Sequence, residues 1–270
     1  MIGSREAVID THVHVFHRGL KFIDSRRFTP DYDVLYERLI ETLDRHGVDK
    51  AVLIAISILG ADNSYLLESL KRSNGRLRGV VAINPATDID RLPEYADSGA
   101  VGIRLNLTGN LPVPDFKSGQ WPDILDFCRQ NRWHIEVNDR CDRLPMTVEP
   151  LLESGTRVVV DHFGMPNADE GLSGEAFQRL LKLADTQLLW LKLSGAYRTS
   201  RSLADAAVPL LLETFGAHRL VWASDWPFTQ REDSQTYQMQ IDDRDRWLSD
   251  PPVRGQVLWD TPSELFHFNV

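Results

Sequence analysis

Hydrophobic residues recur along the chain in eight short runs, and segments with helical spacing separate most of these runs. The runs are rich in Val, Ile and Leu at successive positions, as in parallel strands that are buried on both faces. They predict strands over residues 7–15, 50–56, 77–84, 101–108, 134–139, 157–163, 188–195 and 219–225.

Between the strands, apolar residues three and four positions apart predict amphipathic helices. Leu35, Leu39 and Leu43 form such a stripe in the segment 34–45, and Gly47 follows it as a typical helix-ending residue. The remaining predicted helices cover residues 63–73, 89–96, 121–131, 148–153, 174–184 and 203–215, and the tail 229–270 is helical in parts. Strict alternation of strand and helix indicates parallel strands joined by right-handed crossovers.

Eight such units in 270 residues predict an α/β protein with a single-domain (β/α)8 TIM barrel over residues 1–270. A doubly wound open sheet is the alternative, but no GxGxxG motif follows the first strand to favour it. No composition break or Gly/Ser-rich linker marks a second domain. The connection 16–33 is long for a strand-to-helix loop, and long loops often bind ligands.

The composition is that of a globular protein and excludes several classes of partner. Hydrophobic residues make up 42% of the chain, yet no stretch approaches the ~20 apolar residues that span a bilayer. The net charge of −9 argues against nucleic acid and anionic membranes, whereas a small anionic substrate needs only a few local arginines. Two cysteines without CxxC spacing, and a start with no apolar leader, favour a reduced protein in the cytoplasm. The sequence does not indicate the oligomeric state.

Polar side chains gather where the predicted strands end. His12 and His14 are two residues apart, so a strand would present both imidazoles on one face. The ends of later strands carry further polar residues, namely Arg104, Asn106, Glu136, Asn138, Asp161, His162, Lys192, Ser194 and Asp225. Because barrel enzymes place their chemistry at the carboxyl ends of the strands, these residues are expected to converge on one mouth.

Each of these residues also has a structural explanation when it is considered alone. His162 could be a hydrogen-bonded core histidine, since partly buried histidines are common. Arg104 could pair with Asp161, and Lys192 with Glu136. The convergence of the whole set on one mouth therefore favours an active site more strongly than any single residue does.

Five blocks of sequence carry a resemblance to a known family. They are Asp10-Thr-His-Val-His14, Gly102-Ile-Arg-Leu-Asn106, Asp161-His-Phe-Gly-Met-Pro166, Lys192-Leu-Ser-Gly-Ala-Tyr-Arg198 and Ser224-Asp-Trp-Pro227. In this order the blocks resemble the amidohydrolase superfamily, and within it the branch that contains 2-pyrone-4,6-dicarboxylate lactonase. The resemblance extends over nearly the whole chain, and it is specific for the branch and not for one substrate.

The resemblance implies a hydrolase that opens a carboxylated lactone. Three histidines would surround the carbonyl oxygen or a metal, and an aspartate would be the general base, so the catalytic candidates are His12, His14, His162 and Asp225. Arg104 and Arg198 would hold a substrate carboxylate or the developing oxyanion. The other candidate substrate contacts are Asn106, Asn138, Tyr197 and Arg27, of which Arg27 lies on the first long loop and could close over an anion.

The same four catalytic candidates are the expected ligands if a divalent metal is bound. Nitrogen and oxygen donors suit zinc or manganese. Because the chain has no second histidine on a late strand, at most one metal is expected. Some members of the branch hydrolyse lactones without a metal, so the sequence leaves metal-dependent and metal-independent hydrolysis both open.

Three positions depart from the pattern of the branch. Met165 stands where pyrone-dicarboxylate enzymes carry arginine, Phe228 where they often carry histidine, and Asn138 where close relatives often carry histidine. The expected substrate is therefore a class of lactone, either pyrone-dicarboxylate-like or derived from a sugar acid. The alternatives are a metal-dependent nonoxidative decarboxylase of an aromatic or related acid and a barrel that only binds a ligand.

Overall fold

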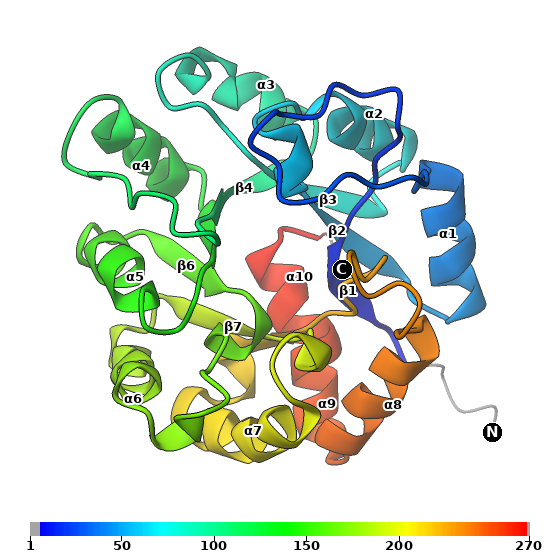
Figure 1. Cartoon of the computed structure of the whole chain (residues 1–270), viewed down its shortest axis with the longest axis vertical. Coiled ribbons are helices and arrows are strands. Elements are labelled where there is room, and N and C mark those ends of the chain that lie inside the picture. Colours follow the sequence, from blue (N-terminus) through cyan, green and yellow to red (C-terminus); the bar gives the residue numbers. More distant parts are fainter. Residues whose placement is uncertain (1–5, 269–270) are drawn as a thin grey trace.

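A computed structural model describes residues 6–268 and shows eight parallel strands surrounded by helices (Figure 1). The strands are β1 (Ile9–Val13), β2 (Lys50–Ile54), β3 (Leu77–Val81), β4 (Ala100–Asn106), β5 (His134–Asn138), β6 (Arg157–Val160), β7 (Leu189–Leu193) and β8 (Leu220–Trp222). Each strand pairs with the next in sequence order. The predicted (β/α)8 barrel is therefore confirmed.

Contacts between the first and last strands complete the ring. Val13 forms a parallel bridge with Trp226, whose carbonyl accepts a hydrogen bond from the backbone N–H of His14 at 3.0 Å. The hydroxyl of Thr11 donates to the carbonyl of Trp222 at 2.9 Å. A doubly wound open sheet places its first strand in the middle of the sheet and leaves its last strand at an edge, whereas these strands follow sequence order and the first meets the last, so that alternative is excluded.

The predicted helices surround the sheet, but several of them begin or end at other residues than predicted. They are α1 (Tyr36–Arg45), α2 (Ser64–Arg72), α3 (Leu92–Asp97), α4 (Trp121–Gln130), α5 (Leu144–Glu153), α6 (Glu175–Lys182), α7 (Arg201–Phe215) and α8 (Tyr237–Trp247). Helix α5 begins four residues earlier than predicted, because Pro145 occupies its first turn, where a missing N–H costs nothing. Leu35 was predicted to face the core but precedes α1 and is 41% exposed.

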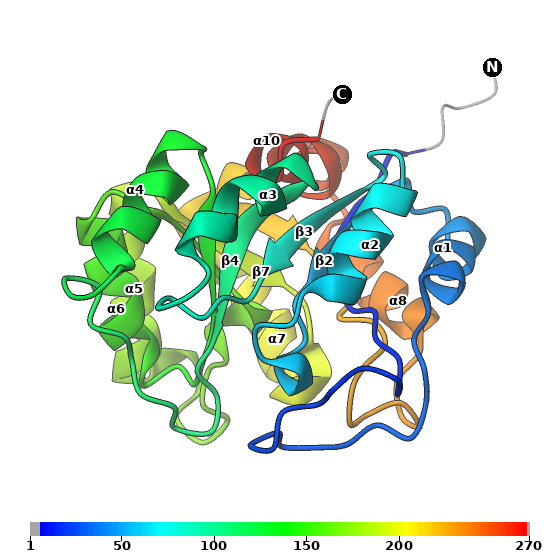
Figure 2. The ribbon, with the colours of Figure 1, turned by 90° about the horizontal axis from the view of Figure 1, so that it is seen from above.

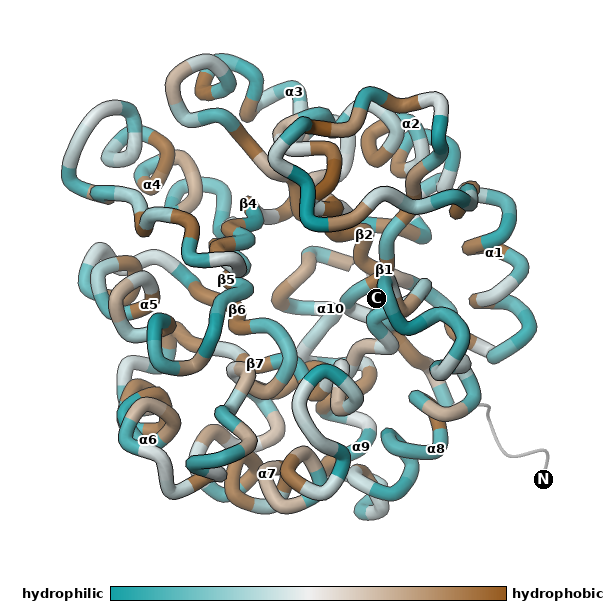
Figure 3. The backbone as a smooth tube through the Cα atoms, viewed as in Figure 1, coloured by the Kyte–Doolittle hydropathy of each residue, from teal (hydrophilic) through white to brown (hydrophobic). Residues whose placement is uncertain are grey.

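The hydrophobic core has two parts, one between the sheet and the helices and one inside the barrel. Hydrophobic residues concentrate in the strands and helices, and long hydrophilic stretches mark many of the connecting loops (Figure 3). Val52, Val159 and Val221 fill the barrel interior together with Leu265 and Phe266 from the C-terminal segment. That segment contains α9 (Pro251–Gly255) and α10 (Thr261–Leu265), and α10 lies at the edge opposite the β1–α1 loop (Figure 2). It closes one end of the barrel and leaves the other end for the site.

Two long loops cover the open end of the barrel. The blue loop between β1 and α1 and the orange loop before α8 both lie at the edge opposite α10 (Figure 2). The hydroxyl of Tyr32 on the first loop donates a hydrogen bond to the carboxylate of Glu232 on the second. The long first loop predicted from the sequence thus lies over the barrel mouth.

Two of the polar residues expected at the strand ends, His162 and Asp225, lie beyond the strands. β6 ends at Val160 and β8 at Trp222, so His162 and Asp225 stand outside the ladder of strand hydrogen bonds. Their φ angles are 50° and 64°, a region that non-glycine residues rarely adopt and that cannot continue a strand. Such backbone conformations persist where the surroundings hold them, and they concentrate at functional sites.

Cys128 and Cys141 are both buried and form no disulfide. No helix within residues 6–268 is both long enough and apolar enough to cross a membrane. The expectation about an N-terminal leader rests on residues 1–5, which lie outside the described part of the chain.

Candidate active site

His12 and His14 lie side by side at the barrel mouth, as their spacing predicted. Their Nε2 atoms are 3.2 Å apart, and Nδ1 of His14 lies 2.7 Å from the carbonyl oxygen of Ile54. Only a protonated Nδ1 can face a carbonyl oxygen at that distance, so a neutral His14 has a bare Nε2. Burial lowers the pKa of His14 to about 3 and also places the pKa of His12 well below its usual value. Both rings are therefore neutral near pH 7.

Asp225 faces this pair from the loop that follows β8. Its Oδ2 accepts hydrogen bonds from the hydroxyl of Tyr197, at 2.6 Å, and from Nε of Arg198. Its Oδ1 lies 3.8 Å from Nε2 of His12. Burial alone would raise the pKa of Asp225, but the charge and the hydrogen bond of Arg198 outweigh burial and hold that pKa well below its usual range. Asp225 is therefore an ionised acceptor at neutral pH.

His162 completes a group of three imidazoles. Its Nδ1 lies 2.9 Å from the hydroxyl of Ser194, and its Nε2 lies 4.0 Å from Oδ2 of Asp225. Gly195 has a φ of +62°, and a Cβ at this position would lie 2.8 Å from Nδ1 of His162. The glycine is therefore needed for both its backbone conformation and the close approach of the ring.

A cluster of four buried charges lies next to the histidines. Nζ of Lys192 donates a hydrogen bond to Glu136 and lies 3.3 Å from Oδ1 of Asp161. Nη2 of Arg104 lies 3.2 Å from Oδ2 of Asp161. The two ion pairs considered from the sequence are thus both present, and two cations balance two carboxylates.

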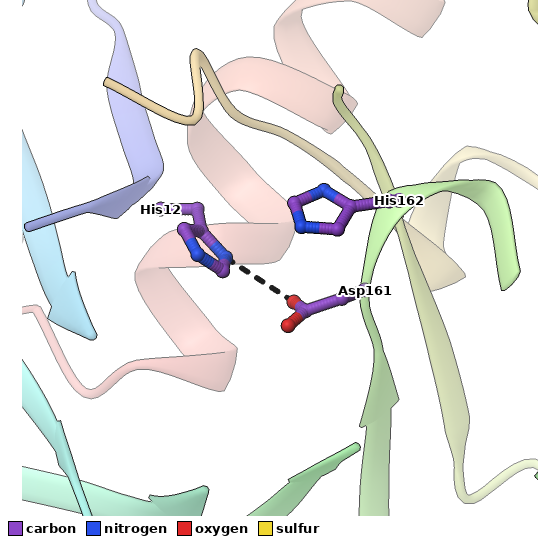
Figure 4. Close-up of side chains that lie close together, drawn as sticks. All are labelled: His12, Asp161 and His162. Atoms are coloured by element: carbon purple, nitrogen blue, oxygen red, sulfur yellow. Dashed lines mark hydrogen bonds and ion pairs between the residues drawn. The ribbon is translucent and has the colours of Figure 1, made fainter. Parts of the chain in front are cut away.

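This cluster also reaches His12. Nδ1 of His12 lies 3.2 Å from Oδ1 of Asp161 and 3.1 Å from Nζ of Lys192. Figure 4 shows His12 facing Asp161 and His162, with the contact to Asp161 dashed. One ring nitrogen therefore has both a cationic and an anionic neighbour.

Two cavities with volumes of about 180 and 40 Å³ open at the mouth. Their shared lining residues are Arg27, Asn138, His162, Arg198, Thr229 and Gln230. The smaller cavity also contacts His14, Arg104, Asn106 and Asp225, and the larger one contacts Met165. Two larger hollows, of about 530 and 670 Å³, lie elsewhere on the surface, and no histidine or aspartate of the catalytic candidates lines them.

Positively charged side chains gather around the two cavities. Burial lowers the pKa of Arg27, and the neighbouring charges of Arg104 and Arg198 lower it further. Like charges are held together in this way where an anion is to be bound. The site therefore suits a small anionic ligand despite the acidic chain.

The remaining candidates differ in how directly they reach the cavities. Oδ1 of Asn138 is buried and has no hydrogen-bond partner among the described residues, whereas Oδ1 of Asn106 accepts from the hydroxyl of Thr108 at 2.6 Å. Tyr197 packs edge-on against Phe228, with ring centroids 6.2 Å apart, and directs its hydroxyl to Asp225.

Among the lining residues that the sequence analysis missed are Thr229, Gln230 and Arg231. They follow directly after the Ser224-Asp-Trp-Pro227 block, and that adjacency was the signal that could have found them.

Within residues 6–268, two groups of side chains could hold a divalent metal, and their donor atoms lie within 4.8 Å of one another in each group. The first is His12, His14 and Asp225, in which two nitrogens 3.2 Å apart match neighbouring ligands of a tetrahedral zinc. The second is His12, Asp161 and His162, where the ammonium group of Lys192 opposes another cation. The donors thus fit one metal in the first group, and His162 belongs to the other group.

Comparisons with known proteins agree with this geometry. The profile of the family described as amidohydrolase matches residues 9–268. A structure from Acinetobacter baumannii, described as a probable 2-pyrone-4,6-dicarboxylic acid hydrolase with citric acid bound, superposes with a TM-score of 0.92. It is 31% identical, over 97% of this chain and 99% of that chain. A structure from Pseudomonas putida, provisionally assigned the same activity, has a TM-score of 0.90 and 36% identity, over 98% of both chains.

A curated relative supports the same grouping. The 4-sulfomuconolactone hydrolase of Hydrogenophaga intermedia is 27% identical over 266 residues, which cover 95% of this chain and 88% of that protein. The chain therefore belongs to the amidohydrolase family, on the branch of the 2-pyrone-4,6-dicarboxylate hydrolases.

Proposed function

We propose that this protein hydrolyses a carboxylated lactone of the pyrone-dicarboxylate or sugar-acid type. The observation that carries the proposal is the ionised Asp225 facing neutral imidazoles at a mouth lined by arginines. Ester hydrolysis requires an activated water, a polarised carbonyl and a stabilised oxyanion. The mouth offers a group suited to each requirement.

In the proposed reaction, Asp225 accepts a proton from the attacking water. Oδ1 performs this step, because Oδ2 already accepts hydrogen bonds from Tyr197 and Arg198. The water oxygen bonds to the lactone carbonyl carbon, and the imidazoles of His12 and His162 donate hydrogen bonds to the carbonyl oxygen as it becomes negative. The ring C–O bond then breaks, and the leaving oxygen takes up the proton to give an open hydroxy acid.

Arg27 and Arg198 are proposed to bind the substrate carboxylate, since both line the two mouth cavities. Met165 lines the larger cavity with an apolar side chain, at a position where the pyrone-dicarboxylate enzymes are expected to carry arginine. We therefore infer a substrate whose carboxylate lies toward the two arginines and whose uncharged part contacts Met165.

A metal held by the first donor group would polarise the carbonyl and lower the pKa of a water molecule. Elemental analysis of the purified protein, with lactone hydrolysis measured before and after chelation, distinguishes metal-dependent from metal-independent hydrolysis. Loss of hydrolysis on removal of a stoichiometric metal supports the metal-dependent form, and full activity of metal-free protein supports the other.

The decisive variant is Asp225→Asn. It retains an oxygen acceptor for Tyr197 and removes the base, so kcat is expected to fall by about 10²–10⁴-fold while the affinity for a product carboxylate is retained. Asp185→Asn, at an exposed position, is the matched control. Unchanged turnover in D225N would refute the assignment of the base. Release of carbon dioxide from an aromatic acid, with no lactone opened, would favour the decarboxylase.

A further inference from the structure

A chain of hydrogen bonds fixes which nitrogen of each imidazole carries the proton. Because Nδ1 of His14 donates to Ile54, its bare Nε2 must accept, and the group 3.2 Å away is Nε2 of His12. Nε2 of His12 must then carry a proton, since two bare nitrogens at this distance would repel each other. A neutral His12 consequently has a bare Nδ1.

Lys192 is the donor that this bare nitrogen needs. Its Nζ lies 3.1 Å from Nδ1 of His12, and the side chain is fully buried. An ammonium group has three N–H donors, and the other two face Glu136 and Asp161. All three donors of Lys192 are thus directed at acceptors, and none is left for solvent.

A metal at the first donor group requires the opposite arrangement. His12 could bind a cation through Nε2 only if that nitrogen were bare, which moves the proton to Nδ1. The proton on Nδ1 would then donate to Oδ1 of Asp161, 3.2 Å away, and the ammonium of Lys192 would face an N–H. Lys192 therefore favours a bare Nδ1 on His12, whereas Asp161 favours a protonated Nδ1.

We propose that Lys192 is a positioning residue that keeps His12 in the form with a proton on Nε2, and thereby opposes metal binding by His12, His14 and Asp225. In this form the N–H on Nε2 of His12 donates to the bare Nε2 of His14, and the proposed reaction would redirect it to the carbonyl oxygen of the substrate. Lys192 thus keeps His12 as a neutral hydrogen-bond donor, although histidine often binds metals. The catalytic consequence rests on the proposed function, whereas the proton position and the metal affinity do not.

The first test locates the proton. Protein labelled with ¹⁵N-histidine and freed of metal is studied by long-range ¹H–¹⁵N correlation, which distinguishes protonated from bare ring nitrogens. The signals of His12 are identified by their loss in His12→Gln. The proposal expects a bare Nδ1 and a protonated Nε2 in the wild type. A protonated Nδ1 would overturn it, and this measurement requires no change at Lys192.

The second test removes the lysine without leaving an unpaired carboxylate. In the double variant Lys192→Met/Glu136→Gln, the ammonium group no longer faces Nδ1 of His12, so the proton of His12 can move to Nδ1 and donate to Asp161 when zinc binds between the two Nε2 atoms. Zinc affinity, measured by competition with a coloured chelator, is expected to rise by about tenfold or more, because outer-shell groups typically change metal affinity by about 10–100-fold and the group removed here opposes the metal-binding form of His12.

Two controls locate the zinc that binds more tightly. His14→Asn in the double-variant background should remove the gain, and Lys182→Met, at an exposed lysine of α6, should leave the wild-type affinity unchanged. A folded double variant with wild-type zinc affinity would overturn the proposal. Because neither readout uses a lactone, the absence of lactonase activity would count against the proposed function alone.

Discussion

Removing the hydroxyl of Tyr197 should change the reaction through Asp225 alone. The hydroxyl donates to Oδ2 of Asp225 at 2.6 Å, and Tyr197 is outside the lining of both mouth cavities. Tyr197→Phe therefore removes one hydrogen bond to the carboxylate and leaves the substrate contacts in place. The neighbouring Arg198 still keeps Asp225 ionised at neutral pH.

The size of the effect follows from the charge of the acceptor. A hydrogen bond to an ionised group contributes about 1.5–3 kcal/mol. Because this bond stabilises the ionised form, its loss should raise the pKa of Asp225 by about 1–2 units at ~1.4 kcal/mol per unit. Asp225 must be ionised to accept a proton, so kcat/KM falls as pH drops through this pKa. The acidic limb of the pH profile should therefore move to higher pH by the same 1–2 units.

The assay is the pH dependence of kcat/KM for lactone opening, followed by titration of the released acid. Tyr237→Phe is a matched control, because its hydroxyl also donates to a buried carboxylate at 2.6 Å, that of Asp10. The control should lower the thermal midpoint and leave the acidic limb in place. If the limb of Tyr197→Phe coincides with that of the wild type, the reasoning about Asp225 is wrong.

Three further variants test other parts of the site. Gly195→Ala would place a Cβ 2.8 Å from Nδ1 of His162, so both kcat and the melting temperature should fall, and an unchanged kcat would contradict the packing argument. Arg104→Met removes one of the cations beside Asp161 and should cost about 3–5 kcal/mol in urea-induced unfolding, whereas a loss below about 1 kcal/mol would show that the pair is dispensable. Arg27→Gln should raise KM for an anionic lactone by about tenfold, or ~1.4 kcal/mol, with kcat nearly constant, and the difference should shrink at high salt.

The alternation of strands and helices was predictable, because each element depends on the pattern of apolar residues within its own segment. A run such as Arg157–Val160 is apolar enough to be a strand covered on both faces, and the spacing of His12 and His14 placed both rings together. The exact strand ends were not predictable. They depend on the surrounding packing, as at the end of β6, where His162 has a positive φ two residues after Val160.

The grouping of charges was predictable only in part. Periodicity indicates that Glu136 and Lys192 each lie on a given face of a strand, but not which residues of other strands they meet. The contact of Lys192 with His12 joins β7 to β1, strands that are not neighbours in the sheet. Such a contact depends on the closure and register of the whole barrel, which no local pattern encodes.

The proposed active site forms only when the segment after β8 pairs with β1, so it requires most of the polypeptide to be synthesised. The backbone N–H of Asp225 donates to the carbonyl of His12 at 3.1 Å, and the carboxylate of Asp10 accepts from the N–H of Ser224 at 2.9 Å. During synthesis the histidines therefore leave the ribosome long before the aspartate that faces them. A nascent chain, or one cleaved before Asp225, has the imidazoles without the base, so only a chain that extends through Asp225 can carry out the proposed reaction.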